Sequence, residues 1–293
     1  MKIKIIILLF FFPLSLFSQV GGITAFSFID VELSPRIEAM GGSGVAIIDC
    51  DVSLGQTTPS LLNSAMHNFL TFSFTDYFSD VNLIGFSYAR KWKEFGVFSM
   101  GIRVINYGEF EYNDDVGNNL GSFSAHDQVI TFGLGKRLNE KFKLGVNLNM
   151  INSQYETYSA FALSSNVSAT YFVPEKKFTS TLLLKNMGRQ LFVYANAKES
   201  LPFDVQFGIS KELKYLPFRY SFTFHKLNQF DIKSPYKLTS QTNIETGEVE
   251  IKSESIAKTA LRHLIIGGEL NPFRKSLYIR GGFNFQRRFD MSL

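Results

Sequence analysis

The chain has 293 residues, a net charge of +4 and only 19% charged residues, whereas soluble domains usually carry about 25%. Phe occurs 31 times and aromatic residues reach 15%, yet the hydrophobic fraction of 45% is ordinary. Lys and Arg are scattered, so no basic stripe predicts a nucleic-acid partner. A chain that is poor in charge but lacks long apolar runs argues against a helical membrane protein and remains compatible with a transmembrane barrel.

The first 18 residues form the one long apolar block of the sequence. Lys2 and Lys4 precede an apolar run from Ile5 to Phe17, and Ser18 is a small residue just before Gln19. The run is too short to span a bilayer, and no stop-transfer pattern follows it. We therefore predict a signal peptide over residues 1–18, cleaved between Ser18 and Gln19, with an uncleaved anchor as the alternative.

Residues 19–66 carry no strand pattern and differ from the rest of the chain. Glycines at 41, 42 and 44 interrupt any long helix, and Thr58-Pro59 is typical of a helix start. The GGSG sequence there lacks the ending of a phosphate-binding loop and is interpreted as a turn. We expect short helices and turns that form a hatch or plug segment. Cys50, the only cysteine, is expected to be a small buried side chain.

From Phe69 onward, large apolar residues alternate with small or polar ones at a period of two. We count about 11 such runs, most of about 9–13 residues, whereas strands of globular sheets usually have about 5–6. The pattern predicts an all-β chain with an antiparallel transmembrane barrel over residues 67–293, and one meandering sheet over 69–289. Clear examples are residues 70–74, 84–88, 98–104, 144–150, 203–209 and 218–224.

The predicted links between strands differ in length. Short turns follow Arg90, Leu138, Val173, Lys211 and Asn271, and longer links are expected near 107–122, 153–159, 188–201 and 226–258. Beyond the first hairpin the two kinds alternate. This alternation is typical of outer-membrane barrels, which have short periplasmic turns and longer external loops.

No residue pattern predicts a catalytic, cofactor or metal site. The four histidines lie far from one another and from Cys50, so no metal-ligand spacing appears. Ser124 and His126 share a strand face, but no third orienting group is identifiable, which leaves an outer-membrane hydrolase as a weak alternative. A charge that faces lipid costs about 2–4 kcal/mol at the midplane. We therefore expect most of the charged strand residues on the polar face; these residues include Arg103, Lys185, Asp204, Arg219, Glu269 and Arg280.

Several segments, in their order and spacing, resemble the PorQ family of type IX secretion outer-membrane proteins, within a wider group similar to FadL-type fatty-acid-transporter barrels. One departure is TPSLLN at 58–63, which stands where an asparagine-proline pairing is more usual. The segments that carry the resemblance are QVGG at 19–22, PRIEAMGGSGVAIIDCDVSL at 35–54, TTPSLLN at 57–63, INYGEF at 105–110, GSFSAHDQ at 121–128, RHLIIGGEL at 262–270 and GGFNFQRR at 281–288.

The resemblance implies a barrel of about 14 strands with an N-terminal hatch in its lumen. It implies a place in the cell outer membrane, in contact with its lipid, and in the attachment complex with PorU, PorV and PorZ. There the chain would anchor a PorZ-like surface partner while cargo is processed and joined to lipopolysaccharide, with the chemistry supplied by a partner. The alternative function is a FadL-like channel for hydrophobic small molecules.

The strand count also predicts that further strands follow this sequence. The run at 276–289 is about the eleventh strand, whereas bacterial single-chain barrels have even strand numbers. We therefore expect no hydrogen-bonded ladder between the strand near Phe69–Tyr77 and the strand at Ser276–Phe289. The tail QRRFDMSL also lacks the pattern of a closing strand.

Overall fold

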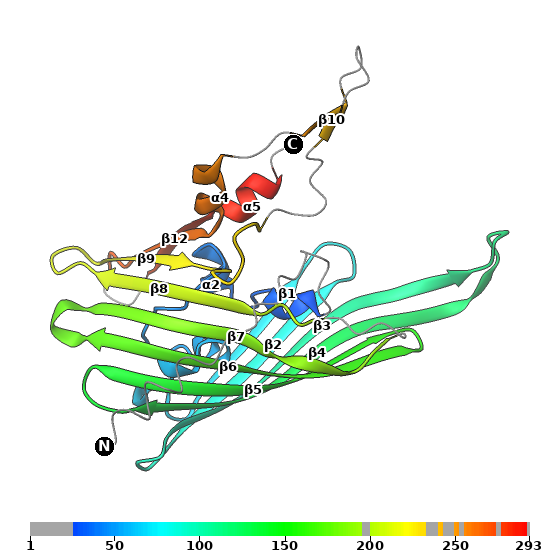
Figure 1. Cartoon of the computed structure of the whole chain (residues 1–293). Helices are drawn as coiled ribbons and strands as arrows, with labels where there is room; N and C mark the ends of the chain where they lie inside the picture. Colours follow the sequence, from blue (N-terminus) through cyan, green and yellow to red (C-terminus); the bar gives the residue numbers. More distant parts are fainter. Residues whose placement is uncertain are drawn as a thin grey trace, which may run out of the picture.

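Eleven antiparallel strands form one curled sheet in the computed structural model, which describes residues 26–194, 200–232, 240–242, 249–251, 255–273 and 277–291 (Figure 1). Each strand pairs with its neighbour in the chain, except that β9 pairs with β12. The strands are β1 (Phe69–Asp76), β2 (Asn82–Trp92), β3 (Gly96–Asn113), β4 (Asn119–Arg137), β5 (Phe142–Tyr155), β6 (Tyr158–Val173), β7 (Phe178–Phe192), β8 (Asp204–Glu212), β9 (Phe218–Phe224), β12 (Leu264–Leu270) and β13 (Ile279–Asn284).

β1 and β13 are the two edges of this sheet, and no ladder joins them. The predicted single antiparallel sheet of eleven strands is confirmed, and so is the expected lack of pairing between its first and last strands. A separate ladder of three-residue strands, β10 (Ser240–Thr242) and β11 (Val249–Ile251), lies in the long connection between β9 and β12.

The N-terminal segment, residues 26–68, runs along the hollow of the sheet as short helices and turns, as the sequence predicts (Figure 1). Pro59 takes the first position of η3, where its missing N–H costs nothing. Helix α2 contacts β13, whereas η3 contacts β4, β5 and β6, so the segment touches strands from both halves of the sheet. Its elements are η2 (Ser27–Asp30), α2 (Pro35–Ala39), α3 (Ser53–Thr57), η3 (Pro59–Leu61) and η4 (Ser64–Met66).

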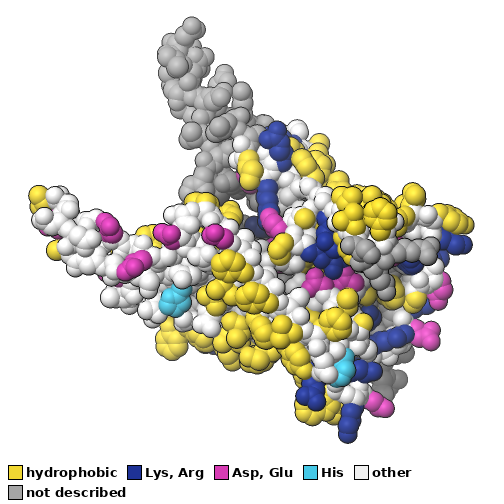
Figure 2. Space-filling view, turned by 180° about the vertical axis from the view of Figure 1, so that it is seen from behind, with side chains coloured by type: hydrophobic (Ala, Val, Ile, Leu, Met, Phe, Trp, Pro, Cys, Tyr) yellow, Lys and Arg dark blue, Asp and Glu magenta, His cyan; other side chains and the backbone are white. Residues whose placement is uncertain are grey.

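The polarity of the sheet is inverted relative to that of a soluble domain. On β5, Leu144, Val146 and Leu148 are each 45% exposed, while the alternating Asn147 and Asn149 are buried. Figure 2 shows the resulting band of apolar side chains across the outer face. Residues that belong to this exposed apolar surface include Phe72, Phe86, Phe98, Met100, Phe132, Val167, Leu182, Phe207, Phe224 and Phe283.

Two short helices interrupt the region that the sequence predicts to be strand and loop alone. α4 (Ile256–Arg262) precedes β12, and α5 (Phe285–Met291) follows β13 directly. The strand predicted at 276–289 is therefore wrong in its second half. Phe285 and Phe289 lie four residues apart, which is the spacing of one helix face, and their rings are 6.0 Å apart. Among the described residues no helix is both long and apolar enough to cross a bilayer.

Two of the four predicted long links are largely strand. β3 and β4 continue to Asn113 and from Asn119, and β5 and β6 are separated by two residues only. The prediction that short and long links alternate strictly is therefore wrong. The two-residue periodicity of a strand continues through residues whose polar composition is typical of a loop. The links between β7 and β8 and between β9 and β12 are long, as expected.

Candidate functional site

The N-terminal segment meets β4, β5 and β6 along a contact that we call the neutral seam, because uncharged groups make it. The Ser60 backbone N–H donates to Ser168 Oγ over 2.8 Å, and the Ser60 hydroxyl lies 2.7 Å from Thr170 Oγ1. The Asn147 amide donates to the carbonyls of Gly55 and Gln56 at 3.0 and 2.7 Å. These groups are buried, so each bond satisfies atoms that water does not reach.

Glycine on the wall allows the segment to approach this closely. A Cβ at Gly145 would lie 2.2 Å from the carbonyl carbon of Pro59, and one at Gly135 would lie 2.6 Å from the Pro59 oxygen. Backbone therefore packs on backbone, and no side chain larger than hydrogen fits there. Glycine is thus required at these two positions because the N-terminal segment packs directly against them.

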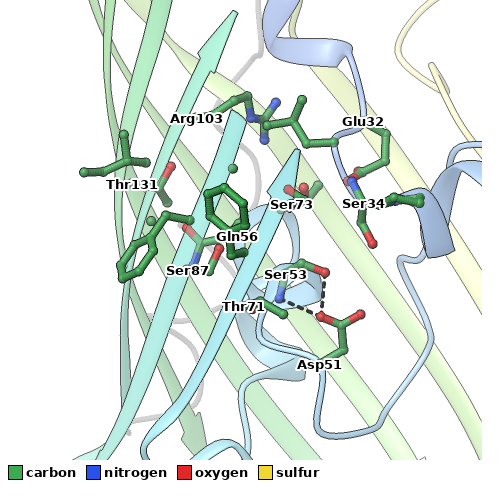
Figure 3. A pocket seen from close by; sticks show the side chains of 18 residues that line it. Glu32, Ser34, Asp51, Ser53, Gln56, Thr71, Ser73, Ser87, Arg103 and Thr131 are labelled. Carbon is green, nitrogen blue, oxygen red and sulfur yellow. Dashed lines mark hydrogen bonds between the residues drawn. The ribbon is translucent and has the colours of Figure 1, made fainter. Parts of the chain in front are cut away.

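A cavity of about 130 Å³ lies between the segment and strands β1 to β4, and its lining includes the apolar residues Leu33, Phe72, Phe86 and Ile102 (Figure 3). The Arg103 guanidinium donates to the carbonyls of Ile29 and Val31, and Asp51 accepts from Ser53. Both amide atoms of Gln56 are buried without a hydrogen-bond partner in the protein. The cavity is large enough for a few water molecules, which such groups require. Further lining residues are Glu32, Ser34, Thr71, Ser73, Ser87 and Thr131.

On the other half of the sheet, charged groups join the segment to β9, β12 and β13, and we call this contact the ionic seam. Glu269, which is 5% exposed, pairs with three arginines. Its carboxylate lies 3.1 Å from Arg36, 3.3 Å from Arg219 and 2.7 Å from Arg280. Arg36 also pairs with Asp49 and Asp51, so this one arginine contacts carboxylates of both the segment and β12.

A cavity of about 870 Å³ opens beside the ionic seam, next to the turns after β8 and β12. Its wall includes Arg36, Arg219, Glu269 and the exposed Cys50. The prediction that Cys50 is buried is wrong, since the residue lies in a turn that borders this cavity. The charged lining makes the cavity unsuited to an apolar ligand.

Two acidic residues of the segment lie near the opposite end of the strands. Asp30 accepts from Lys185 Nζ over 2.8 Å and from the Asn186 amide over 3.2 Å. Burial would raise the pKa of Asp30, but the Lys185 ammonium and the Asn186 amide lower it below its usual value. Glu32 lacks so close a cation, and burial raises its pKa despite the charge of Arg103.

Nearby, the buried Asp127 carboxylate accepts from three hydroxyl groups. Tyr107 and Tyr155 donate over 2.6 and 2.8 Å, and Ser153 donates to the other oxygen. Tyr107 therefore faces the hollow of the sheet. The three hydroxyl groups supply hydrogen-bond donors to a carboxylate that is buried.

His225 and His263 form a reciprocal contact where β9 ends and β12 begins. The His225 N–H donates to the His263 carbonyl over 3.0 Å, and His263 Nδ1 lies 2.8 Å from the His225 carbonyl. His225 Nε2 lies 3.1 Å from the Arg262 carbonyl, a contact that neutral imidazole makes as a donor. Burial lowers the pKa of His225 to about 4.

The structure places the residues that the sequence singled out as follows. The six charged strand residues face the inner side, as predicted: Arg103 and Lys185 bind the N-terminal segment, Arg219 and Arg280 bind Glu269, and Asp204 is buried. Ser124 and His126 both lie on β4 and share one face, whereas Asp127 alternates to the opposite face. The predicted cleavage site, Ser18 and Gln19, lies outside the described residues.

Within the described ranges, no group of three His, Cys, Asp or Glu side chains is placed to hold a metal ion. Sequence reasoning missed the Asp127 cluster and the pairing of Glu269 with Arg36. Neither has a sequence signal, because the first depends on the register of three neighbouring strands and the second joins the segment to the wall. In comparisons with known proteins, no family model and no curated protein sequence matches this chain.

Proposed function

We propose that the chain is a non-enzymatic outer-membrane protein of the PorQ type, which anchors a surface partner for the type IX attachment complex. One observation carries the membrane part of this proposal: the apolar face of the sheet is exposed, and the polar face is buried under the N-terminal segment. On a water-soluble protein, an apolar surface that extends over most strands of the sheet would drive association with other proteins or aggregation. In a bilayer it faces lipid, and the polar face lines the interior.

The anchoring part of the proposal is supported by how the interior is occupied. The N-terminal segment is bonded to the wall through the neutral and ionic seams, and it acts as a hatch. Charged side chains of Arg36, Arg219 and Glu269 border the cavity of about 870 Å³, which suits water or ions better than a fatty acid. We therefore rank the FadL-like channel for hydrophobic small molecules second. The attachment-complex proteins, of the PorZ, PorU and PorV types, are the proposed partners.

The test has two arms, both on the full chain produced in its own host. The first is membrane fractionation with heat-modifiable electrophoretic mobility, where we expect the protein in the outer membrane. The second is a mild-detergent pull-down probed for the PorZ-type surface protein, alongside titration with a radiolabelled long-chain fatty acid. Recovery of the surface protein without saturable fatty-acid binding supports the anchor. Saturable fatty-acid binding without a surface protein would overturn the anchor in favour of the channel.

A further inference from the structure

The hairpin of β3 and β4 extends beyond every neighbouring strand. The last β2 pair is Asn82 with Asn106, and the last β5 pair is Tyr155 with Ala125. The pairing of β3 with β4 continues to Asn113 and Asn119. Residues 109–123, which we call the arm, are therefore a two-stranded ribbon with a free edge on each side. The arm projects from the end of the sheet in Figure 1.

A bulge at the base of the arm sets which way its side chains face. Between the pairs Asn106–His126 and Glu109–Ser124, β3 advances three residues while β4 advances two. Gly108 in the bulge has φ of +86°, a backbone conformation that favours glycine, and its N–H donates to Asn106 Oδ1. The surplus residue reverses the alternation of β3, so even-numbered residues beyond it continue the inner face of the sheet.

The arm consequently has one aromatic face and one acidic face. Phe110 stacks on Phe123 with ring centroids 5.3 Å apart, and Tyr112 follows on the same inner side. Glu109 and Glu111 continue the outer face, which is apolar below the bulge. Phe110 and Tyr112 are 42% and 50% exposed.

The tip of the arm is ordered and acidic. Asp114 Oδ1 accepts from the backbone N–H groups of Val116 and Asn118 over 3.0 and 2.8 Å. The side-chain amide of Asn118 lowers the pKa of Asp114, so this carboxylate is charged at neutral pH. Glu109, Glu111, Asp114 and Asp115 give the arm four negative charges, and no Lys or Arg occurs between Arg103 and Lys136. Figure 2 shows these acidic side chains along the projecting hairpin.

We propose that the arm is the docking element for the surface partner, and that this partner is a protein with an aromatic-accepting groove bordered by Lys and Arg. This inference rests on the proposed function and adds the contact surface and its chemistry. A two-stranded ribbon is marginally stable alone, and exposed aromatic rings are the side chains most often buried at the centre of protein interfaces. The four carboxylates speed encounter with a basic surface and make it dependent on salt.

The adjacent β5–β6 hairpin offers matched controls at the same end of the sheet. Tyr158, which is 55% exposed, matches the arm's aromatic residues, and the exposed Glu156 matches its carboxylates. Neither residue lies on the arm. Tyr158→Ser and Glu156→Gln therefore change one exposed group of the same kind without touching the proposed contact.

The experiment measures binding of the purified full chain, in mild detergent, to the PorZ-type surface protein by surface plasmon resonance. We expect Phe110→Ser/Tyr112→Ser to raise Kd at least tenfold and Tyr158→Ser to leave it unchanged. We expect Glu109→Gln/Glu111→Gln to lower the association rate several-fold and to flatten its salt dependence, with Glu156→Gln as the neutral control. Heat-modifiable mobility checks that each variant is folded.

The outcomes separate this inference from the proposed function. If the unmodified chain does not bind the surface protein, the proposed function fails. If it binds and the arm variants bind equally well, the arm inference alone is overturned. Arm-dependent association with lipopolysaccharide vesicles in Mg²⁺, with unchanged binding to the protein, would also overturn it. A photo-crosslinking residue at position 112 that captures the surface protein, while one at 158 does not, supports it.

Discussion

The neutral seam and the ionic seam hold the same segment against the same sheet by different means. Along β4, β5 and β6, hydroxyl and amide groups bond to backbone, and glycine permits close approach. Along β9, β12 and β13, three arginines surround Glu269. Hydrogen bonds between uncharged groups respond little to salt or pH. In a buried ion pair, removal of one member leaves the other charge buried without its partner, which strongly destabilises the fold. The two halves should therefore fail under different conditions.

The largest effect is expected at the ionic seam. Glu269→Ala leaves Arg36, Arg219 and Arg280 facing one another without the carboxylate, and removal of one member of a buried pair costs about 3–5 kcal/mol. Urea unfolding of the detergent-solubilised protein measures this loss. Glu212→Ala is the control, because its carboxylate is 33% exposed and such pairs contribute about 0–1 kcal/mol. Equal losses in the two variants would contradict the distinction between them.

A steric change should be the most damaging one at the neutral seam. Gly145→Val pushes a side chain into the backbone of Pro59 and Ser60, and overpacking of this kind costs about 1–3 kcal/mol. We expect faster proteolysis within the N-terminal segment, read by mass spectrometry. Gly281→Val is the control, because a Cβ there meets nothing within 4 Å. If proteolysis cleaves the segment of the Gly145→Val protein no faster than that of the unmodified protein, the neutral seam has room for the added side chain.

Removal of the Asn147 amide should weaken the same seam to a lesser degree. Asn147→Ala leaves the Gly55 and Gln56 carbonyls without this donor, at a cost of about 1–2 kcal/mol. We expect this loss to be the same at low and high salt, whereas the small loss in Glu212→Ala should shrink at high salt, because salt screens exposed charges more than buried ones. Urea unfolding at two NaCl concentrations separates the two behaviours.

The smallest effect concerns pH at the contact between β9 and β12. The pKa of His225 is lowered to about 4 by burial, so the unfolded chain takes up a proton first as the pH falls below about 6.5. Stability contributed by the neutral ring is therefore present at pH 7 and is lost as the pH falls, by about 0.7 kcal/mol at pH 6. Melting temperatures of the native protein and of His225→Asn at pH 7 and 6 measure it. A pH dependence that persists in His225→Asn would assign the effect to another group.

Much of the sheet could be predicted from the sequence because one signal repeats along it. Alternation of large apolar and small residues indicated eleven strands, and the cost of charge in lipid placed Arg103 and Lys185 on the inner face. The same alternation also extended through residues 109–123, where Glu alternates with Phe and Tyr. The polar composition of residues 109–123 is typical of a loop, whereas their two-residue periodicity is the signal that indicates strand there.

The seams could not be predicted, because they join groups that are distant in sequence. Arg36 and Glu269 are separated by 233 residues, and nothing in either neighbourhood marks the other as its partner. α5 escaped prediction for a different reason. Its sequence, FQRRFDM, follows Asn284 directly, and no Gly or Pro lies between the last strand residue and the helix. Only the spacing of Phe285 and Phe289 indicates a helix.

The bulge at Tyr107-Gly108 has a genetic consequence. One surplus residue decides which face of the arm is aromatic and which is acidic, because every position beyond it depends on the count of residues before it. An in-frame deletion of a single codon there would move Glu109 and Glu111 to the inner side and Phe110 to the outer side, without altering any side chain of the arm. Phe123 would stay on the inner side, because β4 has no surplus residue. A substitution, by contrast, changes one side chain at a time. The β3 half of the arm can therefore exchange its two faces in a single mutational step, while the strands below keep their register.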